Sequence, residues 1–228
     1  MMQGDRMIIE PGSMVRFFPE EVSSENFKIT HVHLDEERVK REKLRAAFSP
    51  GQYYEVRGLK PGVYVNLCHQ RGGVIMSDTP MEINTNWQFI HTSNGHCLVA
   101  GLGLGVILLI AQDREEVESI TVIEKEQEII ELVATRIPLN EKVTIIRDDI
   151  YTWRPEKGVL FDTIYFDIWD DICGDNNPEM VKLHRAFARK RNTKNPKSWM
   201  TSWRLEDARR LDYEFRAYER EMSMWRSQ

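Results

Sequence analysis

The sequence of 228 residues predicts an α/β fold whose main domain has a mostly parallel sheet with helices on both faces. Three observations support this prediction. Strand-like and helical runs alternate from His96 onward, and a glycine-rich turn follows the first strand-like run. The strand-like runs are apolar almost throughout, as expected when helices cover both faces of a sheet.

Residues 1–95 lack this alternation and predict a small N-terminal α+β module. The highly charged segment 35–48 predicts a helix, because three apolar residues are spaced for one of its faces: Val39, Leu44 and Phe48. A β-hairpin is expected where two β-rich runs flank Gly72-Gly73: 63–67 and 74–76. A short helix is expected to follow, from Pro80 to Trp87.

The α/β domain is expected over residues 96–191. Its best strands are short, β-branched and apolar: 97–100, 120–123, 143–146 and 163–166. Helices are expected between and after these strands: 106–112, 125–135 and 178–191.

Residues 192–228 predict a basic helical extension. The segment lacks strong β-runs, so we expect a sheet truncated at its C-terminal strands, with helices in their place. Trp199 and Trp203 stand four residues apart, which suits the packing of one helix face. An apolar seam then recurs at alternating spacings of three and four: Ala208, Leu211, Phe215, Tyr218, Met222 and Trp225. We expect this seam to dock on its own chain, with a homodimer through the C-terminal helix as the alternative.

The sequence GLGLG, residues 101–105, stands directly after the first strand and directly before a helix. Glycines at such a turn let the backbone approach a ligand, and a helix start offers unpaired N–H groups. The dinucleotide-binding motif G-x-G-x-x-G would need a glycine at Val106, whereas G-x-G-x-G is the form seen in proteins that bind adenosylmethionine. We therefore predict a Rossmann-like domain in which Gly101, Gly103 and Gly105 contribute to a cofactor site.

Acidic residues stand at the ends of the following strands. Glu124, which lies 19 residues beyond the last glycine, is placed to accept hydrogen bonds from two ribose hydroxyls. After the third strand, Asp148, Asp149 and Ile150 are candidates for binding an adenine, with Asp149 preferred over its neighbour for the polar edge. Because the carboxyl ends of parallel strands share one crevice, these residues and Asp167 predict one adenosyl-binding site. A phosphate, dinucleotide or vestigial site is the alternative.

From Val63 to Asp171 the sequence resembles the class I S-adenosylmethionine-dependent methyltransferase superfamily, in particular its spermidine synthase-like branch. In polyamine aminopropyltransferases a hairpin precedes a Tyr-Gln pair, the glycine loop and an Asp-Ser-Ser-Asp-Pro segment. Here a Trp-Gln pair and an Asp-Ile-Trp-Asp segment occupy similar places. The resemblance implies S-adenosylmethionine as cofactor, Gln88 in the cofactor site, Asp167 as the group that deprotonates an attacking amine, and Asp170 as the group that holds a polyamine.

The sequence departs from this branch at several positions. Gly103 replaces an aspartate of the loop, Trp87 a tyrosine, and Asp171 a proline, while Val99 stands where many methyltransferases place an acid. The leading hypothesis is therefore transfer of a methyl group from S-adenosylmethionine to a small-molecule acceptor. The alternatives are aminopropyl transfer from the decarboxylated cofactor and non-catalytic binding of an adenosyl ligand.

Composition and charge bear on other classes of function. A net charge of −5 and an acidic crevice disfavour nucleic acid as a partner. From Val181 onward, however, 13 Lys or Arg oppose 6 Asp or Glu, which would suit an acidic partner or merely a solvated surface. No apolar run predicts a membrane span, and the N-terminus does not resemble a signal peptide, so we expect a cytoplasmic protein with reduced cysteines. The six histidines show no metal-ligand spacing, although His31 and His33 share one face of a possible strand.

Overall fold

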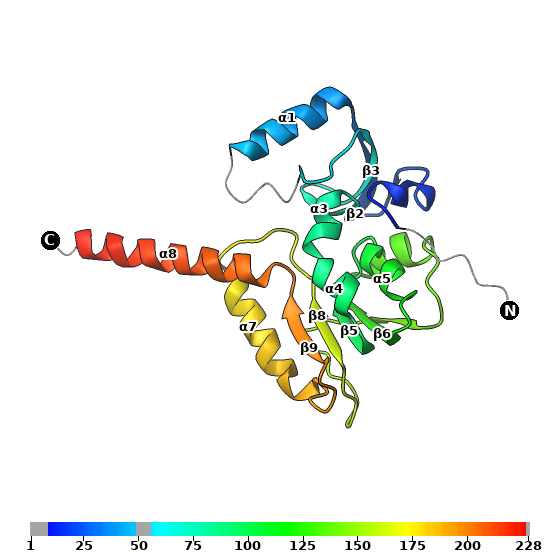
Figure 1. The fold of residues 1–228 in the computed structure, drawn as a ribbon, viewed down its shortest axis with the longest axis vertical. Helices are drawn as coiled ribbons and strands as arrows, with labels where there is room; N and C mark the ends of the chain where they lie inside the picture. The colour runs from blue at the N-terminus through cyan, green and yellow to red at the C-terminus, as the bar shows by residue number, and fades with distance from the viewer. Residues whose placement is uncertain (1–8, 49–55, 227–228) are drawn as a thin grey trace.

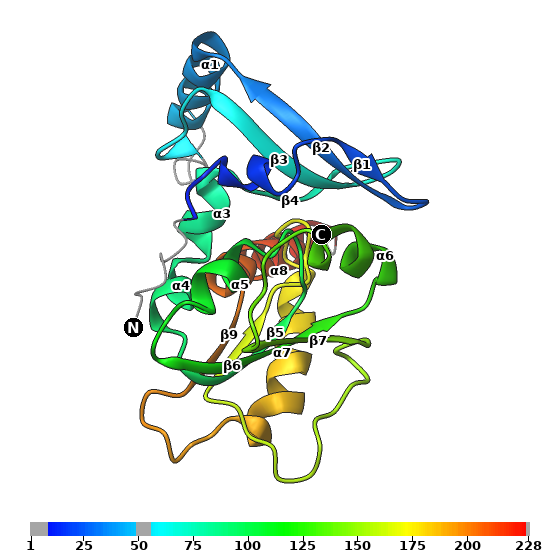
Figure 2. The ribbon, with the colours of Figure 1, turned by 90° about the vertical axis from the view of Figure 1, so that its right-hand side faces the viewer.

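The computed structural model describes residues 9–48 and 56–226. Within them, a small antiparallel sheet lies over a parallel sheet that has helices on both faces (Figures 1 and 2). The Rossmann-like α/β fold with an N-terminal module, predicted from the alternation of apolar runs, is confirmed.

The N-terminal sheet is antiparallel throughout, with the strand order β1-β2-β3-β4. Its strands are β1 (Val22–Ser23), β2 (Phe27–Leu34), β3 (Gly62–His69) and β4 (Val74–Ser77). The expected hairpin is formed by β3 and β4, and β2 pairs along the whole of β3. A short 3-10 helix, η1 (Ser13–Arg16), precedes the sheet and packs against it through Met14.

Helix α1 (Glu36–Ala47) forms where the charged segment predicts it, and Asp35 caps it by accepting the N–H of Arg38. Its buried face differs from the expected one. Val39 packs against Leu59 and Tyr64, whereas Leu44 and Phe48 are exposed. The N-terminal module has a single sheet here, so only a narrow strip of the surface of α1 packs against apolar side chains.

The segment from Pro80 onward forms two helices rather than the single one expected: α3 (Pro80–Thr85) and α4 (Trp87–Thr92). They meet at Asn86, which is fully buried and donates its side-chain amide to the backbone and carboxyl oxygens of Glu82. This interaction ends α3 and starts α4 in a new direction, which leaves Trp87 exposed.

The second sheet is parallel, and its described strands follow the order β7-β6-β5-β8-β9. They are β5 (Gly95–Ala100), β6 (Val117–Glu124), β7 (Val143–Arg147), β8 (Thr163–Phe166) and β9 (Trp199–Ser202). The first four are the predicted strands. The fifth falls within the segment expected to be helical, so that prediction was wrong for residues 199–202.

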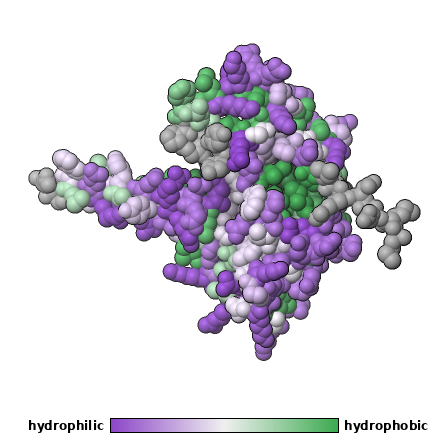
Figure 3. All heavy atoms as spheres, in the orientation of Figure 1, coloured by the Kyte–Doolittle hydropathy of each residue, from purple (hydrophilic) through white to green (hydrophobic). Residues whose placement is uncertain are grey.

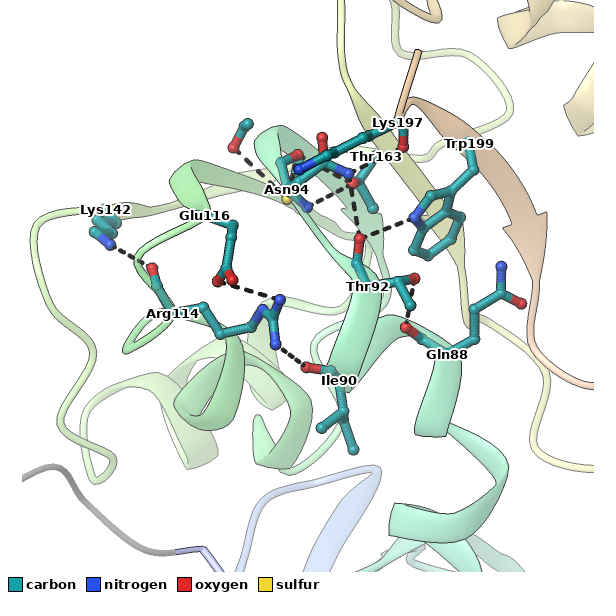
Figure 4. A network of polar contacts seen from close by, with 12 residues as sticks. Gln88, Ile90, Thr92, Asn94, Arg114, Glu116, Lys142, Thr163, Lys197 and Trp199 are labelled. Carbon is teal, nitrogen blue, oxygen red and sulfur yellow. Dashed lines mark hydrogen bonds and ion pairs between the residues drawn. The ribbon is translucent and has the colours of Figure 1, made fainter. Parts of the chain in front are cut away.

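Tertiary contacts make β9 a strand. Trp199 pairs with Thr163 of β8, packs edge-on against Tyr165 and Phe89, and donates its indole N–H to the carbonyl of Thr92 (Figure 4). The two tryptophans therefore do not share a helix face. Trp199 lies in the strand, and Trp203 lies in the turn that follows it. The sheet therefore extends by one strand before the last helix begins.

Helices cover both faces of the parallel sheet. On one face lie α5 (Val106–Ala111) and α6 (Gln127–Ile129), the latter continued by a π-helical turn, η2 (Ile130–Ala134). On the other face lies α7 (Asn176–Phe187), continued by η3 (Ala188–Lys190). Side chains of α7 pack on β5 and β8, and α5 shares its core with β2 and β3 of the N-terminal sheet.

Helix α8 (Leu205–Arg226) begins on the body of the protein and then projects away from it (Figures 1 and 3). Ala208 is fully buried and Leu211 packs against the core. Beyond them the apolar seam is largely exposed, with 54% of Phe215 and 70% of Trp225 accessible, so the expected docking on its own chain stops at Leu211. None of the described helices combines the length and apolarity needed to cross a membrane.

Candidate functional site

The carboxyl ends of the parallel strands point toward the N-terminal sheet (Figure 2), and a cavity of about 360 Å³ lies between them. The ends of β5, β6, β7 and β8 all contribute to its wall. Its roof comes from the N-terminal sheet: Phe27, His69, Ile75 and Met76. The crevice predicted from the strand ends therefore exists, and the N-terminal module covers it.

The glycine loop 101–105 needs glycine at each of its three glycine positions. Gly101, Gly103 and Gly105 have φ angles of +97°, +51° and +73°, in the left-handed region that other residues avoid. A Cβ on the first would also clash with the backbone carbonyl of Asp167, and one on the third with Ile137. Gly101 and Gly103 line the cavity, whereas Gly105 lies outside its wall and starts α5.

Met76 joins the N-terminal sheet to this loop. Its thioether sulfur accepts the N–H of Leu104 at 3.0 Å, and it occupies the space that a Cβ on Gly103 would need. Met76 is nearly buried and lines the cavity. The loop is thus held between the parallel sheet below and β4 above.

Glu124 is buried at the end of β6 and lines the cavity. Its two carboxylate oxygens accept the N–H groups of Leu102 and Glu126, each at 2.8 Å. Burial raises the pKa of this carboxyl, and these hydrogen bonds oppose the rise. Each carboxylate oxygen retains acceptor capacity for a ligand hydroxyl, and the side chain ties the glycine loop to β6.

Asp148, Asp149 and Ile150 line the cavity together at the end of β7. Asp149 accepts the N–H of Tyr151 at 2.8 Å and forms an ion pair with Lys125 at 3.6 Å. Ile150 is buried and offers an apolar surface. This combination of a fixed carboxylate and an apolar side chain is suited to the edge and face of a planar base.

Asp167 follows β8 and faces Glu82 of α3 across the same cavity. Burial raises the pKa of Asp167 to about 7. Burial also raises the pKa of Glu82 well above its ordinary value, and the nearby charge of Asp167 adds to this effect. A hydrogen-bonded chain fixes Glu82, because Tyr165 donates to the Asn86 side-chain oxygen at 2.7 Å and Asn86 donates to Glu82 at 2.9 Å. Asp167 therefore exchanges its proton near neutral pH.

Asp170 lies at the exposed edge of the cavity and contacts the N-terminal sheet. Its Oδ2 is 2.8 Å from Nε2 of His69, at the end of β3. A second contact ties the same sheet to the other side of the cavity, where Glu128 of α6 accepts both the backbone N–H and the side-chain amide of Asn26. The roof is therefore anchored on two sides.

Gln88 lies away from these residues. It lies on α4, near Thr92 (Figure 4). Its side chain is exposed and is not part of the cavity wall. The break at Asn86 turns α4 away from the strand ends, so the Trp-Gln pair does not reach the cavity. In its place α3 contributes Glu82, and Trp203 enters from the turn between β9 and α8, donating its indole N–H to Thr85 at 2.9 Å.

Sequence reasoning missed several residues of the wall. Glu82, His69, Met76 and Trp203 reach it from segments outside the glycine motif and the strand ends. An aromatic and acidic edge is also new: Tyr151, Trp169 and Glu179, with both ring groups donating to the Glu179 carboxylate. The one available signal was Pro80, which starts a helix two residues before Glu82.

The cavity is strongly acidic. Among the described residues, its wall has eight carboxyls: Glu82, Glu124, Glu126, Asp148, Asp149, Asp167, Asp170 and Glu179. The basic side chains in the wall are His69 and Lys125. Such a wall attracts cations and repels anions. Within the described part of the chain, no group of three or more His, Cys, Asp or Glu is arranged to hold a metal ion.

The strand order, the parallel pairing and the glycine turn after β5 give the chain a Rossmann-like α/β fold. No protein-family profile and no curated protein matches the sequence. Among solved structures, the spermidine synthase of Thermotoga maritima is similar at 14% identity and a TM-score of 0.43, covering 75% of this chain and 52% of that one.

Two further solved structures are also similar. The plantazolicin methyltransferase BpumL, in complex with SAH, has 18% identity and a TM-score of 0.35, covering 47% of this chain and 39% of its own. MNMC2 from Aquifex aeolicus has 18% identity and a TM-score of 0.38, covering 57% and 54% of the two chains. This chain thus spans about half the length, or less, of these solved chains.

Proposed function

We propose that the cavity binds S-adenosylmethionine or a close adenosyl relative, and that the protein transfers a group from this donor to a small molecule. One observation carries the proposal. Residues from four separate strand ends line a single cavity: the glycine loop, Glu124, Asp148 to Ile150, and Asp167. A volume of about 360 Å³ is within the usual range for small-ligand pockets, roughly 300–1,000 Å³.

The wall fits the nucleoside half of such a donor. Glu124 has acceptor capacity for ribose hydroxyls. Asp149 supplies a fixed carboxylate beside the buried side chain of Ile150, and Ile129 adds a further apolar surface. These are the interactions that an adenosine needs: acceptors for its hydroxyls and its amino group, and apolar cover for its base.

The other half of the wall fits a positively charged sulfonium and an amine acceptor. The sulfonium makes the carbon attached to it electrophilic, so the protein mainly has to position a nucleophile. Asp167 and Glu82 lie where they can hold an ammonium group and take up its proton before nitrogen attacks. Asp170, at the exposed edge, supports the far end of the acceptor. We therefore propose a small amine as the acceptor and methyl as the group transferred.

Aminopropyl transfer is the second candidate, and the charge of the wall favours it. S-adenosylmethionine has a carboxylate that must enter a cavity with eight carboxyls and few cations. The decarboxylated donor lacks this group and would avoid the repulsion. A choice between the two donors therefore decides between the two reactions.

A thermal-shift experiment tests the proposal and separates these candidates. The full chain is heated with S-adenosylmethionine, with its decarboxylated form, with its demethylated product, and with NAD as the control. A ligand at about 100 times its dissociation constant stabilises the folded state by about 2.7 kcal/mol. Stabilisation by S-adenosylmethionine and its product supports methyl transfer, whereas stabilisation by the decarboxylated donor alone supports aminopropyl transfer. If no adenosyl compound raises the melting temperature, the proposal is wrong.

Turnover distinguishes an enzyme from a protein that only binds. The donor that binds is incubated with the chain and a panel of primary amines, and the products are detected by mass spectrometry. Asp167→Asn should keep most of the binding and lose most of the turnover. Asp171→Asn is the matched control outside the cavity wall, because Asp171 is exposed and asparagine can still accept the N–H of Ile172. Binding without turnover for every amine would favour the non-catalytic alternative.

A further inference from the structure

A second charged surface lies outside the cavity. Residues 181–204 contain eight Lys or Arg and no Asp or Glu. Six of these cations form what we call the cationic strip: Arg185, Arg189, Lys190, Arg191, Lys194 and Lys197. All six have exposed or partly exposed side chains.

The cationic strip lies at the opposite end of the sheet from the cavity. It follows the last turns of α7 and the connection from η3 to β9, which passes the amino ends of β8 and β9 (Figures 1 and 2). The acidic cavity is at the carboxyl ends of the same strands. A ligand of the cavity therefore has no contact with the strip.

Within the described residues, no acidic side chain forms an ion pair with a member of the strip. Helix α8 provides the contrast, because three of its arginines are paired with acids one turn away. Arg209 pairs with Glu206 at 2.7 Å, and Arg216 pairs with Asp212 at 2.7 Å. The two segments thus differ: α8 has five Arg against six Asp or Glu, whereas residues 181–204 have cations and no acid.

The backbone beneath the strip is held in place. The carbonyl of Lys190 accepts the N–H of Phe161 at 2.8 Å, and the carbonyl of Lys197 accepts the side chain of Asn94 at 3.1 Å (Figure 4). The nearby acid, Asp162, is buried and already accepts the side chains of two asparagines and the N–H of His96. In the described part of the chain it forms no ion pair with a residue of the strip. A fixed backbone lowers the conformational entropy lost when a partner binds.

The surroundings of the strip indicate the class of partner. Residues 181–204 expose no large apolar side chain, which removes the apolar contact that membrane attachment needs. The rest of the chain has 23 Lys or Arg against 36 Asp or Glu, so a long polyphosphate would meet repulsion on either side of the strip. A compact acidic surface of a partner protein could contact the strip without approaching the acidic remainder of the chain. We propose that the cationic strip is a docking surface for an acidic region of a partner protein.

A binding experiment with the full chain tests this proposal. Fluorescence anisotropy is measured with a labelled peptide rich in Glu and Asp, and with a single-stranded RNA of the same formal charge. The test variant is the double substitution Arg189→Glu with Lys194→Glu, both exposed. The matched control is Arg209→Glu with Arg216→Glu on α8. We expect the peptide to bind, the test variant to weaken it by about tenfold or more, and the control to change it less than about twofold.

Three results would overturn the proposal: no peptide binding at low salt, an equal loss in the control, or tighter binding of the RNA than of the peptide. The last result would assign the strip to nucleic acid. Circular dichroism and the melting temperature verify that both variants fold. The shift with the adenosyl ligand should be unchanged in the test variant, so the outcome is independent of the function proposed for the cavity.

Discussion

The single residue Glu124 has two roles, because the carboxylate that faces the cavity also holds the glycine loop in place. Glu124→Gln leaves one acceptor oxygen and turns an amide N–H₂ toward a backbone N–H. We expect the free energy of unfolding to fall by about 1–3 kcal/mol, the usual effect of an unsatisfied buried group, and the stabilisation by the adenosyl ligand to disappear. Urea denaturation and thermal shift measure the two effects.

Glu118→Gln is the control for this prediction, because Glu118 is exposed on the same strand, six residues before Glu124. It should change neither quantity. An undiminished ligand shift in Glu124→Gln would contradict the role assigned to this carboxylate.

Asp167 predicts a dependence of stability on pH. Burial holds its pKa at about 7 in the folded state against an ordinary value of 3.8, so between these pH values the folded state binds more protons than the unfolded chain. The free energy of unfolding therefore falls as pH rises through this interval. Asp167→Asn removes this loss and should be more stable relative to the wild type at pH 8 than at pH 5. Melting temperatures across this range measure it.

The prediction for Asp167 fails if the difference in stability between Asp167→Asn and the wild type stays constant or shrinks as pH rises.

The residues of the site that sequence reasoning found are those whose position follows from the topology alone. Glu124, Asp149 and Asp167 end parallel strands, and the ends of parallel strands meet at one edge. His69 and Glu82 could not be found in this way. The contact of His69 with Asp170 spans 101 residues of sequence and depends on how the two sheets pack, which no local pattern encodes.

At the scale of elements, the β3–β4 hairpin supports the glycine loop through Met76. Met76→Ala removes a nearly buried side chain and the acceptor of the Leu104 N–H. We expect a loss of about 2–4 kcal/mol in the free energy of unfolding and a weaker ligand shift. Met76→Leu keeps most of the volume without the sulfur, so it should lose less than about 1.5 kcal/mol. Denaturation of both variants tests this, and equal losses would show that volume plays no part.

Strand β9 shows why one element escaped prediction. Its four residues carry no alternation strong enough to separate a strand from a helix, and its tryptophan has helical spacing with Trp203. Residues 199–202 form a strand because they pair with β8 and because Trp199 packs against Tyr165 and Phe89. Strands β5 to β8, by contrast, are apolar enough to be predicted from the sequence alone.

At the scale of the whole molecule, the two sheets share one apolar core. Met14 and Phe18 of the N-terminal module belong to the same buried cluster as Val99 and Leu108 of the parallel-sheet domain. We expect the chain to unfold in a single calorimetric transition, with equal calorimetric and van't Hoff enthalpies. A fragment of residues 1–95 should remain unfolded by circular dichroism. Two separate transitions, or a folded fragment, would contradict this expectation.

The projection of α8 has a mechanical consequence. The helix starts beside Trp203, a residue of the cavity wall, and its last 15 residues after Leu211 extend about 22 Å at 1.5 Å per residue. A rigid helix of this length amplifies a small tilt: a rotation of about 5° at its base moves its tip by about 2 Å. A spin label near the tip, paired with one on the parallel sheet, would convert small rearrangements around Trp203 into a measurable change of distance.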